Sequence, residues 1–257
     1  MARIIAIANQ KGGVGKTTTA INLSAALVEL KRRVLLIDMD PQGNAGRGLG
    51  VDITLAKKTV YEALAEDMNL KECICTTSLP GLDLVPSNLR LASLESLMYR
   101  EPKEKPFSML SEAINNASLE YDYIVIDCPP SLGLLSINAL TCASSVLIPV
   151  QCEYFAMEAL AAILSSISNI QNQWNPDLKI EGFLLTMYDA RTQLGTEIAT
   201  EVRRLFKENT FLVSIPRNQS VSESQAKQMP VTTFRPSSQG SIAYFGLARE
   251  VIDHEER

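Results

Sequence analysis

The chain has few residues that could hold a transition metal. A single histidine, His254, stands near the C-terminal end of its 257 residues. The five cysteines, at positions 73, 75, 128, 142 and 152, form no C-x-x-C pair. Structural zinc sites need four Cys or His ligands at characteristic spacings. The sequence therefore argues against a zinc site. We expect the cysteines to be reduced thiols, as in a cytoplasmic protein.

Long apolar runs and an excess of basic residues are also missing. No apolar stretch approaches the roughly 18 residues that a membrane span needs, and the first one is too short for a secretory signal. The apolar share of 46% and charged share of 21% are typical of a globular protein. The net charge of −5 argues weakly against nucleic acid as a partner, although a local basic face could still exist.

Apolar runs alternate with helical patterns along most of the chain. Six runs predict strands, at residues 4–8, 33–37, 123–126, 145–150, 180–185 and 211–213. The clearest helices are predicted at residues 157–173 and 194–207, where apolar residues recur with a period near 3.6. Continuous β-branched runs indicate strands that are covered on both faces. We therefore expect an α/β fold with a doubly wound, mostly parallel sheet flanked by helices.

The least regular region covers about residues 42–118. It has four glycines between positions 43 and 50 and a Glu-Pro-Lys-Glu-Lys-Pro run at 101–106. We interpret it as loops and short helices inserted in one domain, so that residues 1–257 form a single domain. A glycine-rich stretch directly after a strand is where a mobile switch loop is expected.

Residues 10–19, Gln-Lys-Gly-Gly-Val-Gly-Lys-Thr-Thr-Thr, form a glycine loop between the first strand and a helix. Such a loop turns its N–H groups inward and adds the positive end of the helix dipole, which cradles a polyphosphate. Lys16 is placed to reach the terminal phosphates, and Thr17 to offer its hydroxyl to Mg²⁺. The ordinary G-x-x-x-x-G-K-[ST] pattern fails because its first position is Gln10, while an extra lysine, Lys11, opens the loop.

Three carboxylates follow predicted strands. Asp38 and Asp40 end the second strand, and Asp127 ends the strand at 123–126. The carboxyl ends of parallel strands open on the edge that also carries the glycine loop. An apolar run ending in Asp is the Walker B pattern, whose carboxylate holds Mg²⁺ directly or through water. Many strand-ending aspartates only cap the next helix, so the combination with the loop carries the prediction.

Taken together, these motifs resemble the ParA/Soj family of deviant Walker A ATPases, whose relatives include MinD and the nitrogenase iron protein. The resemblance covers nearly the whole chain. It rests on Lys11–Thr18, Asp38-x-Asp40-Pro41-Gln42-Gly43-Asn44, Asp127-x-Pro129-Pro130-Ser131, Pro149–Tyr154, Thr186–Thr192 and Ile215–Asn218.

The resemblance implies an ATPase that binds ATP and Mg²⁺ between two subunits of a homodimer. It assigns the loop residues Lys11, Gly12, Gly13, Val14, Gly15, Lys16, Thr17 and Thr18 to ATP. Lys11 matches the signature lysine that reaches the partner's phosphates, and a cation delivered in this way stabilises the transferring phosphoryl group. With Lys11 and Lys16, Asp40 is assigned to catalysis, acting on the attacking water.

Further residues receive roles from the same resemblance. Thr17, Asp38 and Asp127 are assigned to the metal. Met187 is assigned to ATP, Pro216 and Asn218 to the adenine pocket, and Glu153 to the nucleotide edge of the dimer.

The family's ATP-bound dimer binds DNA without sequence specificity, and a ParB-like protein stimulates hydrolysis. The residues that match its basic surface are Arg191 and Arg217. Phosphate contacts from a few arginines are compatible with a chain that is acidic overall. The expected location is cytoplasmic, on the nucleoid when ATP is bound.

The sequence departs from the family pattern in two places. Ser220, Gln225 and Gln228 stand where relatives often have Arg, Pro and Gly, so the DNA-binding face is weaker or differently arranged. With Lys11 close to the start, we expect no N-terminal helix-turn-helix domain and no operator binding by this chain.

Two other functions stay open. A MinD-like membrane ATPase ends in a basic amphipathic helix, whereas the tail here, up to Arg257, is acidic and opposes stable membrane association. A nucleotide-gated scaffold that positions a protein cargo would use the same switch without DNA. An iron–sulfur carrier needs paired cysteines, and Cys128 beside Asp127 stands alone.

Overall fold

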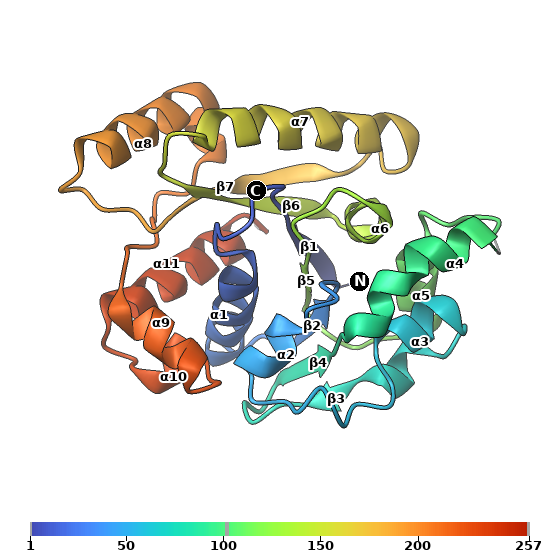
Figure 1. Ribbon diagram of the computed structural model, residues 1–257. Coiled ribbons are helices and arrows are strands. Elements are labelled where there is room, and N and C mark those ends of the chain that lie inside the picture. The colour runs from blue at the N-terminus through green and yellow to red at the C-terminus, as the bar shows by residue number, and fades with distance from the viewer. Residues whose placement is uncertain (1, 101–102, 256–257) are drawn as a thin grey trace.

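The computed structural model describes residues 2–100 and 103–255 and contains one seven-stranded sheet (Figure 1). The strand order is β3-β4-β2-β5-β1-β6-β7, and every neighbouring pair is parallel except the antiparallel pair β3–β4. The strands are β1 (Arg3–Ile7), β2 (Val34–Asp38), β3 (Cys75–Thr76), β4 (Leu82–Val85), β5 (Tyr123–Asp127), β6 (Ser145–Gln151) and β7 (Lys179–Thr186).

Helices cover both faces of this sheet. The α-helices are α1 (Lys16–Glu29), α2 (Asn44–Gly48), α3 (Val60–Ala65), α4 (Leu94–Arg100), α5 (Met109–Asn116), α6 (Leu134–Cys142), α7 (Ala156–Gln173), α8 (Gln193–Phe206), α9 (Gln219–Ala226), α10 (Val231–Phe234) and α11 (Gln239–Asp253). Short 3₁₀ helices are η1 (Leu70–Cys73), η2 (Leu89–Ser93) and η3 (Lys207–Asn209).

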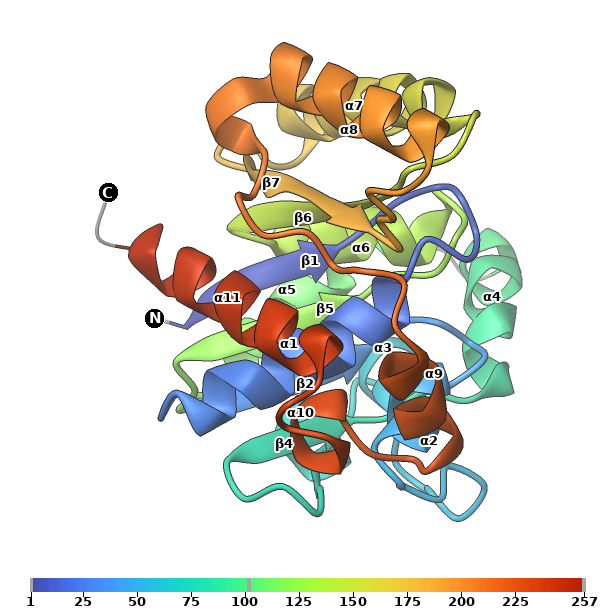
Figure 2. The ribbon, with the colours of Figure 1, turned by 90° about the vertical axis from the view of Figure 1, so that its left-hand side faces the viewer.

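The strands feed two separate cores because successive side chains point to opposite faces. In β1, Ile5 and Ile7 join the core under α1 and α11, whereas Ala6 joins the core formed with α3 to α8. Figure 2 shows α1 and α11 side by side across their face of the sheet. The doubly wound, mostly parallel α/β fold predicted from the sequence is confirmed.

The chain order places a crevice at the carboxyl ends of β1 and β5. β1 leads into α1 on one face, and its neighbour β5 leads into α6 on the other. The two loops therefore turn away from each other, which is the topological switch point where open α/β sheets bind ligands. Asp38 and Asp127 stand opposite each other in the β2–β5 register at this edge.

Five of the six predicted strands are confirmed, and the strand predicted at residues 211–213 is wrong. The N–H groups of Leu212 and Val213 donate to the carboxylate of Glu250, at 2.8 Å each, instead of to a neighbouring strand. Phe211 packs so closely on Gly182 that a Cβ there would lie 2.6 Å from its ring. The segment follows β7 with only an isolated bridge between Phe183 and Thr210.

The region 42–118 is more ordered than the sequence suggested. It adds β3 and β4 to the sheet, and α2 occupies the expected switch loop. Gly43, with φ of +64°, has no room for a side chain, since a Cβ would lie 2.4 Å from Ile53 and 2.8 Å from the Ser87 carbonyl oxygen. The prediction that this region belongs to a single domain is confirmed.

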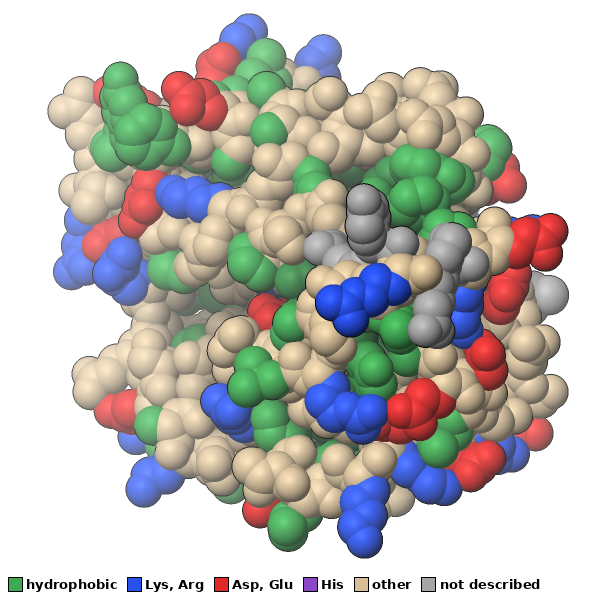
Figure 3. All heavy atoms as spheres, turned by 45° about the vertical axis from the view of Figure 1, so that its right-hand side comes forward, with side chains coloured by type: hydrophobic (Ala, Val, Ile, Leu, Met, Phe, Trp, Pro, Cys, Tyr) green, Lys and Arg blue, Asp and Glu red, His purple; other side chains and the backbone are tan. Residues whose placement is uncertain are grey.

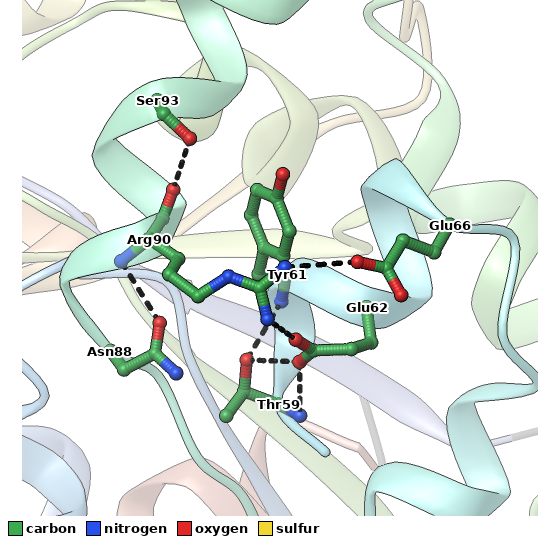
Figure 4. Close-up of polar contacts among 7 residues, drawn as sticks. All are labelled: Thr59, Tyr61, Glu62, Glu66, Asn88, Arg90 and Ser93. Carbon is green, nitrogen blue, oxygen red and sulfur yellow. Dashed lines mark hydrogen bonds and ion pairs between the residues drawn. The ribbon is translucent and has the colours of Figure 1, made fainter. Parts of the chain in front are cut away.

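A buried carboxylate ties this region together (Figure 4). Glu62 accepts hydrogen bonds from the N–H and hydroxyl of Thr59, both at 2.7 Å, and forms the capping box of α3. Arg90 from η2 pairs with Glu62, bonds Glu66 at 2.9 Å and lies 4.3 Å from the centre of the Tyr61 ring. The network fixes α3 to η2 and completes the pairing of a buried charge.

The surface is mixed on the face turned forward in Figure 3, where Lys and Arg side chains stand among Asp and Glu. In residues 2–100 and 103–255, no helix has the length and apolar character needed to cross a membrane. Two parts of predicted segments lie outside the described residues. They are residues 256–257 of the acidic tail, and Glu101 and Pro102 of the run at 101–106.

Candidate nucleotide-binding site

The glycine loop joins β1 to α1 in a conformation that leaves its backbone open. Gly13 and Gly15 have φ values of +77° and +91°, in the left-handed region that glycine adopts without strain. A Cβ added at Gly12 or Gly13 would meet nothing within 4 Å. Gly15 is the N-cap of α1, and no side chain caps that end. The first N–H groups of the helix are therefore available to an anion.

The two lysines of the loop have different surroundings. Lys16 is 7% exposed, donates to the Lys11 carbonyl oxygen at 3.0 Å, and has its pKa lowered by burial. Lys11 points outward and pairs with Glu153 at 3.2 Å, with 27% of its side chain exposed. Only Lys16 is directed into the loop of its own chain. Lys11 is held at the rim by the carboxylate that the sequence had placed at the nucleotide edge.

The aspartates at this edge differ in how their charge is satisfied. Asp38 is buried and accepts from the N–H groups of Asp40 and Ala45, both at 3.0 Å. Burial raises the pKa of Asp38 to about 7, and the Asp40 carboxylate adds to the rise. Asp127 is also fully buried, and neither of its oxygens makes a hydrogen bond of ordinary geometry. Burial and then the Asp38 charge raise the pKa of Asp127 well above its usual value, against the opposing effects of Thr17 and Lys16.

A magnesium ion fits this arrangement if phosphates supply part of its shell. Asp127 offers two unpartnered oxygens, and Thr17 stands close enough to influence it. Among the described residues, no three His, Cys, Asp or Glu side chains form a cage for a metal. Mg²⁺ is ordinarily held by one or two carboxylates, phosphate oxygens and waters, so such a cage is not required. Cys128 is buried in the core under α6.

A cavity of about 350 Å³ opens beside the loop. It brings together Gly15 and Thr18 of the loop region with Met187, Pro216 and Asn218, three residues predicted to bind ATP. Asn218 caps α9 by accepting from the Ser220 N–H at 3.0 Å. Larger cavities of about 480 and 840 Å³ lie between α3 and α5 and at the amino ends of β6 and β7. Neither of these two cavities is lined by a predicted site residue. The cavity of about 350 Å³ is therefore the candidate nucleotide-binding cavity.

Sequence reasoning missed several residues of this cavity, and two of them close it. Gln225 donates to the Thr18 hydroxyl at 2.5 Å, closing the cavity from α9, and Tyr244 enters it from α11. Both come from helices far along the chain. Gln225 was noticed only as a departure from the family pattern, and a buried tyrosine in a C-terminal helix gives no signal of its own.

Of the two arginines predicted to contact DNA, Arg217 lines the cavity, and Arg191 lies in the turn between β7 and α8. Arg217 is exposed and borders the cavity next to Pro216, and its N–H donates to the Tyr188 carbonyl oxygen at 3.2 Å. Arg191 has 89% of its side chain exposed and pairs with Asp189. The segments that carry the arginines are thus the ones that form the cavity wall.

Comparison with known proteins gives a consistent picture. The family described as "AAA domain" matches residues 2–180. The chain is 46% identical to the sporulation initiation inhibitor protein Soj of Bacillus subtilis, covering 98% of each chain. It is also 46% identical to the chromosome partitioning protein ParA of Myxococcus xanthus, covering 99% of this chain and 89% of that protein.

Solved structures agree with the fold. Cobyrinic acid a,c-diamide synthase from Mycobacterium smegmatis, with bound ATP analog and magnesium, is 36% identical with a TM-score of 0.88, and the match covers 100% of this chain and 96% of that one. The cell division ATPase MinD of Pyrococcus furiosus is 28% identical with a TM-score of 0.81, over 99% and 100% of the two chains. The chain therefore belongs to the family of the Soj and ParA chromosome partitioning proteins, within the MinD/ParA-type P-loop ATPases.

Proposed function

We propose that this protein is a partitioning ATPase: an ATP-dependent homodimer that binds DNA without sequence specificity and hydrolyses ATP when a ParB-like partner stimulates it. The observation that carries the nucleotide part is Asp127, a buried carboxylate beside Thr17 and Lys16 whose oxygens make no hydrogen bond of ordinary geometry with the described residues. A buried charge without a partner is costly unless a ligand completes it. Mg²⁺ with a nucleotide phosphate is the ligand that suits this set of groups.

The roles of the chain's own residues follow from their positions. The loop N–H groups and Lys16 bind the phosphates, and Thr17 and Asp127 hold the metal with Asp38 beside them. Bound Mg²⁺ neutralises phosphate charge. Asp40, half-buried and fixed by the Gln42 N–H at 2.9 Å, orients the attacking water and receives its proton. Met187, Pro216 and Asn218, which line the cavity beside the loop, hold the base.

Dimerisation is supported by the position of Lys11. Its ammonium forms an exposed pair with Glu153 at 3.2 Å, and Glu153 is its one partner among the described residues. Such a pair is weak, so exchanging Glu153 for a phosphate of the second subunit costs little. Delivery of this cation in trans gives the phosphoryl group a charge that no cis arginine provides.

DNA binding is supported by the pair Arg191 and Arg217 and by the names of the relatives, which are chromosome partitioning proteins. Phosphate contacts position a protein on DNA without reading its sequence. Dimerisation doubles the number of arginines that face one duplex, and thereby makes DNA binding depend on ATP. We place the ATP-bound form on the nucleoid.

The test is retention of duplex DNA with and without a slowly hydrolysed ATP analogue at low salt. The wild type should bind duplex DNA of any sequence only with the analogue. Arg191→Ala and Arg217→Ala should lower the affinity for all DNA sequences equally, while ATP still binds. Lys11→Ala should bind ATP and remain monomeric in sedimentation. An ATP dimer that ignores DNA would instead favour the protein-cargo scaffold.

A further inference from the structure

The turn after β7 holds one arginine in a single orientation. In Asp189, Oδ1 accepts from the Arg191 N–H at 3.0 Å and from its Nε at 2.9 Å, while Oδ2 accepts from Nη2 at 2.7 Å. The carbonyl oxygen of Asp189 accepts from the N–H and hydroxyl of Thr192, the N-cap residue of α8. A side chain that is 89% exposed is therefore fixed by its neighbour two residues earlier.

This geometry leaves only part of the guanidinium free. An arginine carries five N–H donors, and the bidentate pair uses Nε–H and one N–H of Nη2. The other three, including both of Nη1, stay available to a phosphate. A phosphate that engages the Nε edge, where bidentate binding is strongest, has to displace the Asp189 carboxylate.

Arg217 lies within electrostatic reach of the same carboxylate. Tyr188 forms an isolated parallel bridge with Pro216, and its N–H donates to the Ile215 carbonyl oxygen at 3.0 Å. This bridge sets Asp189 and Arg217 next to each other in space. The hydrogen bonds from Arg191, with a smaller effect of the Arg217 charge, lower the pKa of Asp189 to about 2. The carboxylate is ionised at every pH at which DNA binding is studied.

We propose that Asp189 is an internal counterion that competes with DNA phosphates for Arg191 and Arg217 and so sets the affinity of the DNA-contacting surface. This inference rests on the proposed function. The two arginines contribute two positive charges per protomer, and Asp189 cancels one of them. The dimer therefore meets the duplex with about half of the charge that its arginines carry.

Stability does not require this pair. An exposed ion pair contributes little to folding, and the turn depends mainly on the acceptor Oδ1 and the Asp189 carbonyl oxygen. Asp189→Asn keeps an acceptor at the Oδ1 position and removes the charge. Asp52 offers a matched control, because its Oδ1 accepts from the Thr54 N–H at 3.0 Å and hydroxyl at 2.6 Å in the same kind of turn, without an arginine.

The experiment is a salt titration of DNA binding with the full chain. Fluorescence anisotropy of a labelled duplex is followed with a slowly hydrolysed ATP analogue between about 50 and about 200 mM salt. We expect Asp189→Asn to bind about three- to tenfold more tightly at the low-salt end. Its log–log salt slope should be steeper by up to about 2 per dimer, since each gained phosphate contact adds about 0.9. Asp52→Asn removes the same charge and should change affinity by less than about twofold.

Each outcome bears on the inference. If the wild type binds DNA and Asp189→Asn behaves like Asp52→Asn, the counterion role is wrong and the proposed function stands. Weaker binding by Asp189→Asn would make Asp189 a positioning residue for Arg191, which also overturns the counterion role. Absence of DNA binding by the wild type and by Asp189→Asn at low salt would overturn both proposals. Asp189→Ser, which lacks the charge but keeps a turn acceptor, should bind tightly as well, and protects the test against a folding defect specific to Asn.

Discussion

Two buried carboxylates at opposite edges of the sheet differ in how many hydrogen-bond partners they have. At the amino ends of the strands, Glu181 has 1% of its side chain exposed and is surrounded by partners. Arg3 and Ser145 donate to its Oε2, each at 2.6 Å, and His254 lies 3.1 Å from its Oε1. At the carboxyl ends, Asp127 is equally buried, and neither of its oxygens makes a hydrogen bond of ordinary geometry with the described residues. The charge of Glu181 is satisfied without a ligand. The charge of Asp127 is satisfied only when a ligand binds.

This difference separates stability from function in space. A satisfied buried charge fixes structure, and removing it leaves its partners unpaired. An unsatisfied one is a cost to the free protein that a ligand recovers as binding energy. Substitutions at the carboxyl-end site should therefore remove activity and spare the fold, and substitutions at Glu181 should do the reverse.

The largest effect is expected for Lys16→Ala. The variant loses the only cation directed into the glycine loop, and with it several charge-assisted hydrogen bonds to phosphate. ATP affinity measured by calorimetry should fall at least about 100-fold, to the point where binding is no longer detected. Lys57→Ala, an exposed lysine away from the loop, serves as the control. Binding of ATP by Lys16→Ala at wild-type affinity would show that the loop has been assigned wrongly.

Asp40→Ala should separate binding from chemistry at the same edge. ATP should still bind and drive dimerisation, because the phosphates are held by the loop and Lys16. Hydrolysis should fall about 100-fold or more, since the carboxylate that acts on the attacking water is gone. Phosphate release in the presence of Mg²⁺ measures this. Unchanged turnover would transfer the role to Asp38, the next carboxylate along the strand.

Much of the carboxyl-end edge could be predicted from the sequence because its parts are local. The glycine loop, Lys16 and the strand-ending aspartates each stand within a few residues of the strand that positions them. The cluster of polar residues around Glu181 was not predicted, because its members stand far apart in the sequence, at positions 3, 145, 181 and 254. The same reason explains Gln225, whose partner Thr18 is 207 residues away, and the false strand at 211–213, whose N–H groups are taken by Glu250.

Glu181→Ala should destabilise the fold without touching the nucleotide site. It leaves Arg3 and Ser145 without their shared acceptor and removes the contact of β7 with His254 at the end of α11. The expected loss in the free energy of unfolding is about 3 kcal/mol, measured by urea denaturation. Glu208 is an exposed carboxylate that lines the same cavity as Glu181, at the amino ends of β6 and β7. Glu208→Ala should change the free energy of unfolding by less than about 0.5 kcal/mol. A loss of ATP affinity with unchanged stability would contradict the division between the two edges.

The smallest effect should appear in the pH dependence of the ligand-free protein. The pKa values of Asp127 and Asp38 are raised in the folded state, Asp38 to about 7, so each group favours folding below its unfolded pKa of 3.8 and loses that contribution as the pH rises through its folded value. Between pH values of about 5 and about 8, the free energy of unfolding should therefore fall.

Asp127→Asn removes one of these ionisations while keeping the shape of the side chain. At a pH of about 8 it should be more stable than the wild type by at least about 1 kcal/mol, the equivalent of a shift of less than one pKa unit. As the pH falls toward about 5, the difference between the two proteins should shrink, because protonation makes the wild-type carboxyl neutral and close in shape to the amide. Denaturation at both pH values measures this, with the exposed Asp177→Asn as the control. A variant less stable than the wild type at the higher pH would mean that Asp127 is already satisfied in the free protein, and the contrast with Glu181 would then disappear.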